Sequence, residues 1–396
     1  MVLSNNDGCV IARSAEAKAL GIPMGAPAFQ WKEHFKANGV EVFSSNYALY
    51  GDMSRRVMTT LALHAPSLEV YSIDEAFLAL DGLRLGGDTL EGFAGRVRAT
   101  VRQWTKIPVG VGIGATKVLA KVANRAAKKA DGVFVLDHET TAGKDLLEAW
   151  PCEEVWGIAR RTAEKLASLG IVTAGQLSRA KRSMIRQRFG VVGERLVLEL
   201  QGVSCLALEE VQPKRQNICC SRSFGRPVED LQDLHEAVAT FASRAGEKLR
   251  RQNLAASAVQ VFLATNPHKP EEPQHFPTAG RPFLVPTSFT PEIIGEASKL
   301  LRGMYREGRR YAKAGILCLG LVPDEEKQGS LFRPVDPEAE EKQRRLMAAV
   351  DKLNLHYGRG TVRSATAGFK QGWQMRQQQV SPHYTTRWKD LPVVRL

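Results

Sequence analysis

The chain has 396 residues, of which 43 % are hydrophobic and 24 % charged, a composition that excludes wholesale disorder and fibrous folds and allows several domains. Lysine and arginine total 55 against 42 aspartate and glutamate residues, which gives a formal net charge of +13. Such a surplus favours a polyanionic partner over a small neutral substrate. A basic surface that serves only solubility would give the same count.

Targeting signals and metal-binding patterns are missing from the sequence. No apolar stretch approaches the roughly 18 residues that span a bilayer, and the N-terminus lacks the basic and apolar regions of a signal peptide. The cysteines show no zinc-ligand spacing. We therefore expect a cytoplasmic protein with reduced thiols and no structural zinc. The six cysteines are Cys9, Cys152, Cys205, Cys219, Cys220 and Cys318.

The first third of the chain alternates between periods of two and of 3.6 residues, which predicts a mixed α/β layer. A helix is expected over residues 14–20, where Gly21 ends it. The pattern then predicts strands over 41–46, 67–73, 75–80, 107–113 and 132–136, with helices over 47–64, 88–104 and 116–129.

Residues 150–202 are helical in pattern and basic, and a Pro/Lys/Arg joint at 212–215 separates them from a second α/β unit. That unit reads β-α-β-β-α-β, an order that resembles the split βαβ motif. Its predicted elements are 217–224, 231–251, 256–265, 281–289, 291–305 and 313–322. An acidic, proline-bearing linker and a short helical, basic tail follow to residue 396.

Two adjacent carboxylates, Asp74 and Glu75, interrupt an apolar β pattern. Charge is expensive there unless a cation or hydrogen bonds compensate it. Neighbouring side chains of a strand face opposite ways, so both reach one site only at a turn or bulge. A hairpin at this point would suit Mg²⁺ that holds phosphates, while a plain solvated turn would need no metal.

A glycine-rich stretch, residues 110–117, leaves a strand and enters a helix. It loosely satisfies GxGxxA, with Asp137 about 20 residues on, so a dinucleotide-binding oxidoreductase is a competing interpretation. Close packing of helix on strand would also explain the glycines. The following helix carries only basic charges, a face suited to phosphates: Lys117, Lys121, Arg125, Lys128 and Lys129.

A third signal lies in residues 155–171, which predict two short helices joined by a Gly-Ile hairpin. Such a hairpin can present backbone N–H groups to a DNA phosphate without reading the base sequence. A plain helical hairpin is the alternative. The candidate contacts are Gly157, Ile158, Arg160, Arg161 and Lys165.

Seven separated segments together resemble the UmuC-type Y-family translesion DNA polymerases, in the right order and from residue 2 to the C-terminus. They are SNNDGCVIARSAEAKALGIPMG, FSSNYALYGDMSRRV, YSIDEAF, VGVGIGATKVLAKVAN, VWGIARR, CSRSFG and SPHYTTRW. Such a set is far more specific than any one motif, and it makes the oxidoreductase a distant alternative.

The resemblance implies an α/β multi-domain fold, the right-handed Y-family polymerase. It would have fingers (1–45), a ferredoxin-like palm (46–135), a helical thumb with a helix-hairpin-helix (136–205) and a βαββαβ little finger (214–322). A linker with a clamp-binding peptide (323–338) and a C-terminal segment (339–396) would follow. The implied function is template-directed, error-prone translesion synthesis in SOS-type DNA repair.

The resemblance also assigns roles to single residues. Asp74 would ligate two catalytic Mg²⁺ ions and Glu75 would assist the primer-side ion. Lys18 and Lys128 match triphosphate-binding positions, and Cys9 and Ile11 would roof the nascent base pair. Contacts to DNA would extend to Arg222 and Ser223.

Partners follow from the same resemblance: primer–template DNA, deoxynucleoside triphosphates, a sliding clamp, a UmuD′-like dimer and a RecA filament. Gln328, Leu331 and Phe332 resemble a clamp-binding peptide, which can dock in a surface groove. The alternative is a Leu-Phe pair packed back on the little finger. The YTTR sequence at 384–387 is typical of the family, but its role has no physical explanation in the sequence.

The chain also departs from its family, whose members open with a strand that carries DxNxFYAS. That strand supplies a metal-binding aspartate and an aromatic steric gate, and neither Asp7 nor Asp52 matches it. If residue 1 is the true start, we expect impaired polymerase activity or a non-catalytic remnant that binds DNA and clamp. A start assigned too far downstream would give the same sequence. Ala159 replaces a family glycine, at a cost of about 1 kcal/mol if φ is positive there.

Overall fold

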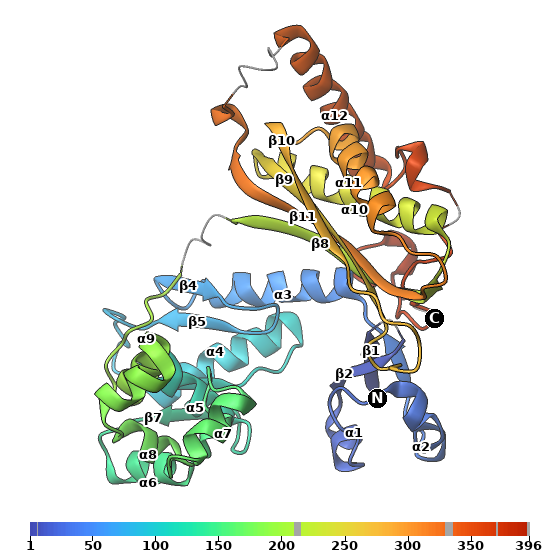
Figure 1. The fold of residues 1–396 in the computed structure, drawn as a ribbon. Coiled ribbons are helices and arrows are strands. Elements are labelled where there is room, and N and C mark those ends of the chain that lie inside the picture. The colour runs from blue at the N-terminus through green and yellow to red at the C-terminus, as the bar shows by residue number, and fades with distance from the viewer. Residues whose placement is uncertain (6, 210–214, 329–335, 370, 394–396) are drawn as a thin grey trace. The chain divides into compact units, whose positions relative to one another are not determined.

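The computed structural model describes residues 1–5, 7–209, 215–328, 336–369 and 371–393 (Figure 1). Its contacts divide the chain into two compact units. The first unit comprises Met1–Ser45 and Lys214–Ser381, and the second comprises Asn46–Pro213 and Pro382–Leu396. Among the described residues, none of the helices is both long and apolar enough to cross a membrane.

The N-terminal part of the first unit is a three-stranded sheet in the order β2-β1-β3. Strand β1 runs antiparallel to β2 and parallel to β3. Buried Val2, Val10, Ile22 and Phe35 form its small core. The elements are β1 (Val2–Asn5), β2 (Cys9–Arg13), α1 (Ala15–Ala19), η1 (Ala28–Trp31), α2 (Lys32–Ala37) and β3 (Val42–Ser44).

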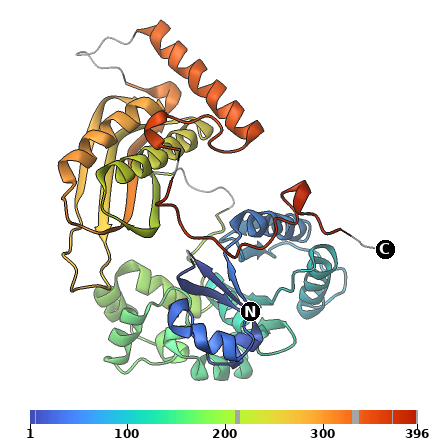
Figure 2. The ribbon, with the colours of Figure 1, turned by 90° about the vertical axis from the view of Figure 1, so that its right-hand side faces the viewer.

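The larger part of the first unit is a four-stranded sheet in the order β10-β9-β11-β8. Neighbouring strands are antiparallel throughout, and helices α10 and α11 cover one face (Figures 1 and 2). Strand β11 lies between β8 and β9, which confirms the predicted split βαβ order. The elements are β8 (Asn217–Val228), α10 (Leu231–Arg251), β9 (Leu254–Thr265), β10 (Thr278–Thr287), α11 (Thr290–Met304) and β11 (Tyr311–Pro323).

Helix α10 shows how the sequence specifies this layer. Asp230 caps its first turn by accepting hydrogen bonds from the N–H groups of Gln232 (2.7 Å) and Asp233 (3.1 Å). Leu234, Val238 and Phe241 follow at spacings of four and three, and all are at most 1 % exposed. This apolar stripe forms the core with the sheet.

The C-terminal segment adds to the same core. Trp373 is buried and its ring lies 6.1 Å from Phe224 and 5.6 Å from Phe241, between ring centroids. Farther along, the N–H of Ser44 donates to Gln379 O (2.9 Å), so the segment extends the edge formed by β3. The tail elements are η3 (Asp324–Glu326), α12 (Pro337–Tyr357), η4 (Ala365–Ala367) and η5 (Trp388–Asp390).

The second unit opens with the predicted mixed α/β layer. Its strands form two separate pairs, β4 antiparallel to β5 and β6 parallel to β7, rather than one continuous sheet among the described residues. The elements are α3 (Tyr47–Leu61), β4 (Ser67–Val70), β5 (Ala76–Ala79), α4 (Leu90–Thr105), β6 (Val111–Gly114), α5 (Lys117–Ala127) and β7 (Val133–Leu136).

The helical part of the second unit shares one hydrophobic core with α5. Glu199 is fully buried there, and its carboxylate accepts hydrogen bonds from the N–H groups of Val118 (3.2 Å), Cys205 (2.6 Å) and Leu206 (3.0 Å). These bonds compensate the buried charge. The elements are α6 (Thr141–Ala149), η2 (Cys152–Glu154), α7 (Arg160–Ala167), α8 (Ala174–Ser178) and α9 (Arg182–Leu200).

Two expectations about single residues can be compared with this fold. Ala159 has φ −81°, so the cost expected for a positive φ does not arise there; the positive φ of this hairpin is at Gly157 (+92°). Burial raises the pKa of Cys152 to about 11 and that of Cys318 to about 12, which keeps both side chains as thiols at neutral pH.

Candidate active site and nucleic-acid interface

The two predicted carboxylates lie at a hairpin turn, as expected. Strand β4 ends at Val70 and β5 begins at Ala76. The N–H groups of Tyr71 and Ser72 both donate to Glu75 O, at 3.1 and 3.0 Å, and close the turn. Because these bonds take the chain out of the strand pattern, Asp74 and Glu75 are not forced onto opposite faces of a sheet.

Asp74 and Glu75 differ in their environment. Asp74 is exposed, and its Oδ1 accepts a hydrogen bond from Ser72 Oγ at 2.6 Å. Glu75 Oε1 instead lies 2.6 Å from Lys121 Nζ on α5. The turn therefore presents one carboxylate toward solvent and one that already has a cation beside it.

A second glutamate of the same hairpin pairs with the same helix. Glu69 of β4 forms an ion pair with Lys117 at the start of α5, and both side chains are under 10 % exposed. Lys117 Nζ also donates to Ala207 O (2.8 Å), and the N–H of Glu209 donates to Glu69 Oε2 (2.8 Å). All these partners belong to the second unit, so this buried pair fixes the hairpin to α5.

Helix α5 carries its lysines on one face. Spacings of four and eleven residues place Lys117, Lys121 and Lys128 within about 40° of one another around the helix axis. Lys128 is exposed at the C-cap. The sequence singled out this basic face, but not the pairing of Lys121 with Glu75; an acid-free helix face after a hairpin rich in acids was the available signal.

The glycines before α5 serve close packing. A Cβ on Gly112 would lie 2.0 Å from the backbone nitrogen of Asn124, and one on Gly114 would lie 2.7 Å from that of Ala120. Asp137 follows β7 as predicted, but its Oδ1 accepts from the N–H of Glu139 (3.0 Å) in the next loop. The glycine pattern is thus explained by helix–strand contact and requires no dinucleotide.

The predicted Gly-Ile hairpin lies at the start of α7. Ile158 is 7 % exposed within the hydrophobic core, and its N–H donates to Val155 O (3.1 Å). Arg160 is exposed and pairs with Glu164 at 2.9 Å. Gly157, Arg161 and Lys165 are also exposed, so the basic residues face solvent while Ile158 anchors the turn.

The predicted finger residues belong to the first unit. Cys9 and Ile11 are exposed on β2 while Val10 between them is buried, so the two share the outer face of the strand. Lys18 is exposed in the last turn of α1.

Two other carboxylates, which do not match the family's metal ligand, already have hydrogen-bond partners. Asp7 Oδ2 accepts from the N–H of Gln378 at 3.0 Å. Asp52 is buried and accepts from Arg56 Nε at 2.9 Å. Hydrogen bonds from Arg56 and Thr385, with Arg55 nearby, hold the pKa of Asp52 below its ordinary value. This is a contact of the YTTR sequence that the sequence alone did not explain.

The remaining predicted contacts lie on the first unit. Arg222 and Ser223 are exposed on β8. Burial, together with nearby Arg222 and Arg359, lowers the pKa of Arg244 on α10, which marks a local concentration of positive charge. Gln328 is exposed, whereas Leu331 and Phe332 of the predicted clamp peptide lie outside the described residues.

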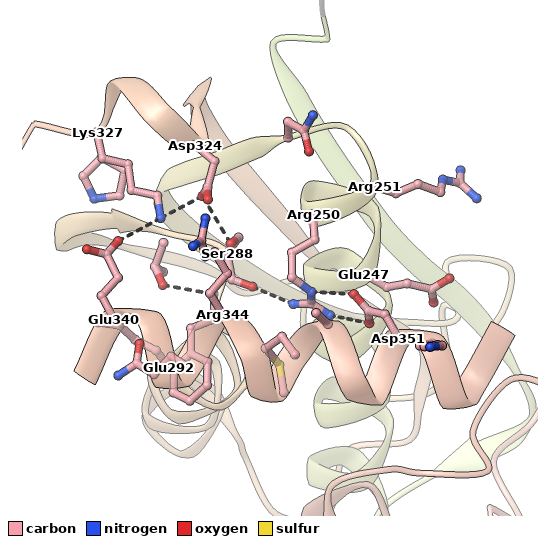
Figure 3. Close-up of a pocket in the computed structure, with 18 of the residues that line it drawn as sticks. Glu247, Arg250, Arg251, Ser288, Glu292, Asp324, Lys327, Glu340, Arg344 and Asp351 are labelled. Atoms are coloured by element: carbon pink, nitrogen blue, oxygen red, sulfur yellow. Dashed lines mark hydrogen bonds and ion pairs between the residues drawn. The ribbon is translucent and has the colours of Figure 1, made fainter. Parts of the chain in front are cut away.

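A cavity of about 1010 Å³ lies between α10, α12 and the end of β10 (Figure 3). None of the predicted site residues that the structure describes lines it, although Gln328 directly follows the lining residue Lys327. Arg250 crosses it: its Nε and Nη2 contact Asp351 at 2.7 and 2.8 Å, and its Nη1 donates to Ser288 O at 2.7 Å. These bonds use most of the donors of the guanidinium, so Arg250 serves to hold α12 on α10.

The donor set at the β4–β5 turn suits a hard cation. Among the residues that the structure describes, no three His, Cys, Asp or Glu side chains gather into a metal site. Mg²⁺ in polymerase-type sites is bound by one or two carboxylates together with substrate phosphates and water. Asp74 and Glu75 meet that minimum.

Family models match most of the chain. The impB/mucB/samB family matches residues 1–125, and the impB/mucB/samB family C-terminal domain matches residues 215–331. A domain of unknown function (DUF4113) matches residues 344–394, which include Trp373 and the YTTR sequence.

Curated relatives and a solved structure agree with these models. Protein UmuC of Salmonella typhimurium is 47 % identical over 99 % of this chain and 93 % of its own length. DNA polymerase IV of Moorella thermoacetica is 30 % identical over 91 % of this chain and 86 % of its own. A Y-family DNA polymerase chimera, Dbh-Dpo4(243-245)-Dbh, matches with a TM-score of 0.64 and 20 % identity over 81 % of this chain and 92 % of its own. That match confirms the predicted fold class.

Proposed function

The chain belongs to the impB/mucB/samB family of UmuC-type Y-family DNA polymerases, and from this premise we propose that the β4–β5 turn is its site of nucleotidyl transfer. Family membership gives the general activity: translesion DNA synthesis on primer–template DNA from deoxynucleoside triphosphates, with a divalent metal. The proposal concerns which residues of this chain carry each step.

The observation that carries the proposal is the exposed Asp74 beside Glu75 at a turn closed by backbone hydrogen bonds. In the proposal these two carboxylates hold Mg²⁺. Two Mg²⁺ ions held there would supply activation of the primer 3′-hydroxyl and neutralisation of the leaving pyrophosphate. Ser72 keeps the Asp74 carboxylate oriented through its 2.6 Å hydrogen bond.

Positive charge supplies the rest of the nucleotide site. Lys128 and Lys18, both exposed, are proposed to bind the triphosphate, where an ammonium acts as a point charge on phosphate oxygens. Cys9 and Ile11 are proposed to cover the nascent base pair from the outer face of β2. Their modest size leaves room for a distorted template base.

Primer–template DNA is proposed to contact two basic surfaces. One is the start of α7, where Gly157, Arg160, Arg161 and Lys165 are exposed and the first N–H groups of the helix lack intrahelical partners. The other is β8, at Arg222 and Ser223, with the positive charge of Arg244 close by. Both would bind phosphates, so affinity should fall steeply with salt.

The remaining assignments rest on the family resemblance. We propose the domain division given above, fingers 1–45, palm 46–135, thumb 136–205 and little finger 214–322, followed by the linker 323–338 and the C-terminal segment 339–396. A sliding clamp at Gln328, Leu331 and Phe332, a UmuD′-like dimer, a RecA filament, an SOS-type role and a cytoplasmic location complete the proposal.

In the part of the chain that the structure describes, the turn itself carries two carboxylates, and one of them is already paired with a lysine. We therefore expect low turnover from the 396-residue chain. The same observation favours a second candidate function, a DNA- and clamp-binding protein that does not extend the primer.

Single-nucleotide extension of an undamaged and an abasic primer–template tests the assignment. Asp74→Asn should abolish Mg²⁺-dependent incorporation and leave DNA binding unchanged. Asp81→Asn, which changes an exposed aspartate beyond β5, is the matched control. Incorporation retained in Asp74→Asn overturns the site. Salt-sensitive DNA binding by wild-type protein without any incorporation supports the second candidate.

A further inference from the structure

Three aromatic rings lie together beside the two lysines of α5 that pair with the β4–β5 hairpin. Tyr71, Phe77 and Trp156 form a cluster with centroid distances of 5.8 Å (Tyr71–Phe77), 5.4 Å (Tyr71–Trp156) and 5.7 Å (Phe77–Trp156). Trp156 Nε1 also donates to Tyr71 Oη at 3.3 Å. We call Tyr71, Phe77 and Trp156 the aromatic cluster. Its members border both ends of the turn and the hairpin before α7.

Lys121 is fixed by this cluster as well as by Glu75. Its Nζ lies 5.6 Å from the ring centroid of Tyr71 and 5.9 Å from that of Trp156. An ammonium over a ring face is attracted by the quadrupole of the ring. The lysine therefore has partners that remain in place when the Glu75 carboxylate turns toward another ligand.

Trp156 has little freedom of its own. Its neighbour Val155 is 2 % exposed and Ile158 is 7 % exposed, both in the core of the helical part. On its other side Gly157 has φ +92°, and a Cβ there would approach Leu196 Cδ2 to 3.1 Å. With the backbone held on both sides, the indole is directed onto the β4–β5 hairpin.

From these contacts we propose that Lys121 and Trp156 are positioning residues for the carboxylates of the turn, an inference that rests on the proposed function. Lys121 orients the Glu75 carboxylate and balances its charge before the metal arrives. Trp156 keeps Lys121 and Tyr71 in place and thereby ties the turn to the proposed DNA-binding hairpin.

Removal of the Lys121 ammonium should have opposite effects on two quantities: metal affinity should rise and nucleotide incorporation should fall. Removal of the Lys121 ammonium takes a positive charge from beside Glu75, so a cation at the turn is held more tightly. The same change leaves the carboxylate free to rotate, so incorporation falls. A loss of folding would lower both quantities together.

Terbium(III), which binds carboxylate oxygens and emits when a nearby indole is excited, is the probe for metal binding in the full chain. Lys121→Met should bind terbium about tenfold more tightly, and Lys121→Arg should stay near wild type. Lys144→Met, at an exposed lysine of α6, is the matched control. Unchanged terbium affinity in Lys121→Met overturns the inference, whether or not incorporation is measurable.

Incorporation provides the second readout. Lys121→Met and Trp156→Leu should each lower it by about 10–100-fold, the size typical of residues that orient a metal ligand, with unchanged primer–template affinity. Trp156→Phe keeps a ring and should lose less; Trp104→Leu, on the exposed indole of α4, is the control. Wild-type incorporation in Trp156→Leu overturns the role of Trp156.

A failure of the proposed metal site can be distinguished from a failure of the positioning role by a further variant. The double variant Asp74→Asn/Glu75→Gln should abolish the terbium signal. If the signal persists, the metal lies elsewhere and the site assignment fails. If the signal disappears but Lys121→Met binds terbium like wild type, the site stands and only the positioning role fails.

Discussion

Lys117 and Lys121 lie one turn apart on α5, and each pairs with a glutamate of the β4–β5 hairpin, yet the two pairs differ in environment. The Lys117 and Glu69 side chains are 9 % and 8 % exposed, whereas those of Lys121 and Glu75 are 21 % and 39 % exposed. The Lys117–Glu69 pair, the inner pair, also has backbone partners at Ala207 and Glu209. Aromatic rings lie beside both lysines, Phe77 beside Lys117 and Tyr71 and Trp156 beside Lys121. The Lys121–Glu75 pair, the outer pair, differs in its greater exposure to solvent.

This difference separates a structural ion pair from one available for chemistry. A buried pair with additional backbone hydrogen bonds cannot release its carboxylate without a large desolvation cost. A partly exposed carboxylate can exchange its lysine for a metal at little cost because water screens the pair. Under the proposed function, position along one helix thus decides which glutamate of the hairpin is accessible to a metal ion.

The largest loss of stability is expected from a substitution that breaks the inner pair. Lys117→Met leaves the Glu69 carboxylate buried without its cation and should lower the free energy of unfolding by about 3–5 kcal/mol. Lys121→Met should lower it by no more than about 1 kcal/mol, since that pair is partly exposed. Urea unfolding of both variants, followed by circular dichroism, measures the difference.

The double variant Lys117→Met/Glu69→Leu is the control for the inner pair, because it replaces both charges by apolar groups. It should recover much of the stability that Lys117→Met loses. Equal losses in Lys117→Met and Lys121→Met would show that burial does not distinguish the two pairs.

A smaller effect concerns the packing that sets the distance from α5 to β6. Gly112→Ala places a Cβ 2.0 Å from the Asn124 nitrogen, so helix and strand must move apart, at a cost of about 1–3 kcal/mol. Gly110→Ala is the matched control, since its nearest neighbour is at 3.7 Å; thermal unfolding of the two variants should separate them clearly.

A third carboxylate, Asp52, extends the comparison to pH. Its pKa is lowered in the folded protein by hydrogen bonds from Arg56 and Thr385. The stability it contributes is therefore complete above its ordinary value of 3.8 and is lost as the pH falls through the lower folded value. Asp52→Asn should lower the urea midpoint at pH 6 and converge with wild type in strong acid.

Thr385→Val is the companion variant for Asp52, because it removes one of the hydrogen bonds and keeps the carboxylate. It should show a weaker pH-dependent loss in the same direction. A constant difference between wild type and Asp52→Asn across the acid range would mean that the carboxyl is not perturbed by folding.

The comparison also shows where the sequence was informative. Local signals located the elements well: α10 spans residues 231–251 as predicted, and the turn at Asp74 and Glu75 follows from two adjacent carboxylates in a β pattern. The resemblance of seven ordered motifs gave the fold class, which the comparison structure confirms.

The features that could not be predicted from the sequence depend on contacts between residues that are far apart in the chain. The pairing of Lys121 with Glu75 joins positions 46 residues apart. The buried Glu199 of α9 accepts a hydrogen bond from the N–H of Val118 on α5, 81 residues away, as well as from that of Cys205. Neither has a local pattern. The division of the α/β layer of the second unit into two strand pairs is likewise a matter of which strands meet.

The smallest expected effect lies at the start of α7, where Ala159 is the N-cap and no side chain caps the helix. Ala159→Ser should stabilise the protein by about 1 kcal/mol through a hydrogen bond to the first turn. Ala159→Asp should stabilise it similarly, but its charge lies among the exposed Arg160, Arg161 and Lys165, where it would repel a DNA phosphate. Fluorescence anisotropy with primer–template should therefore show weaker binding for Ala159→Asp alone. Equal DNA affinity in both variants would place the phosphate contact away from this helix, whereas a loss confined to the aspartate would separate stability from function at one residue, as the two lysines do on α5.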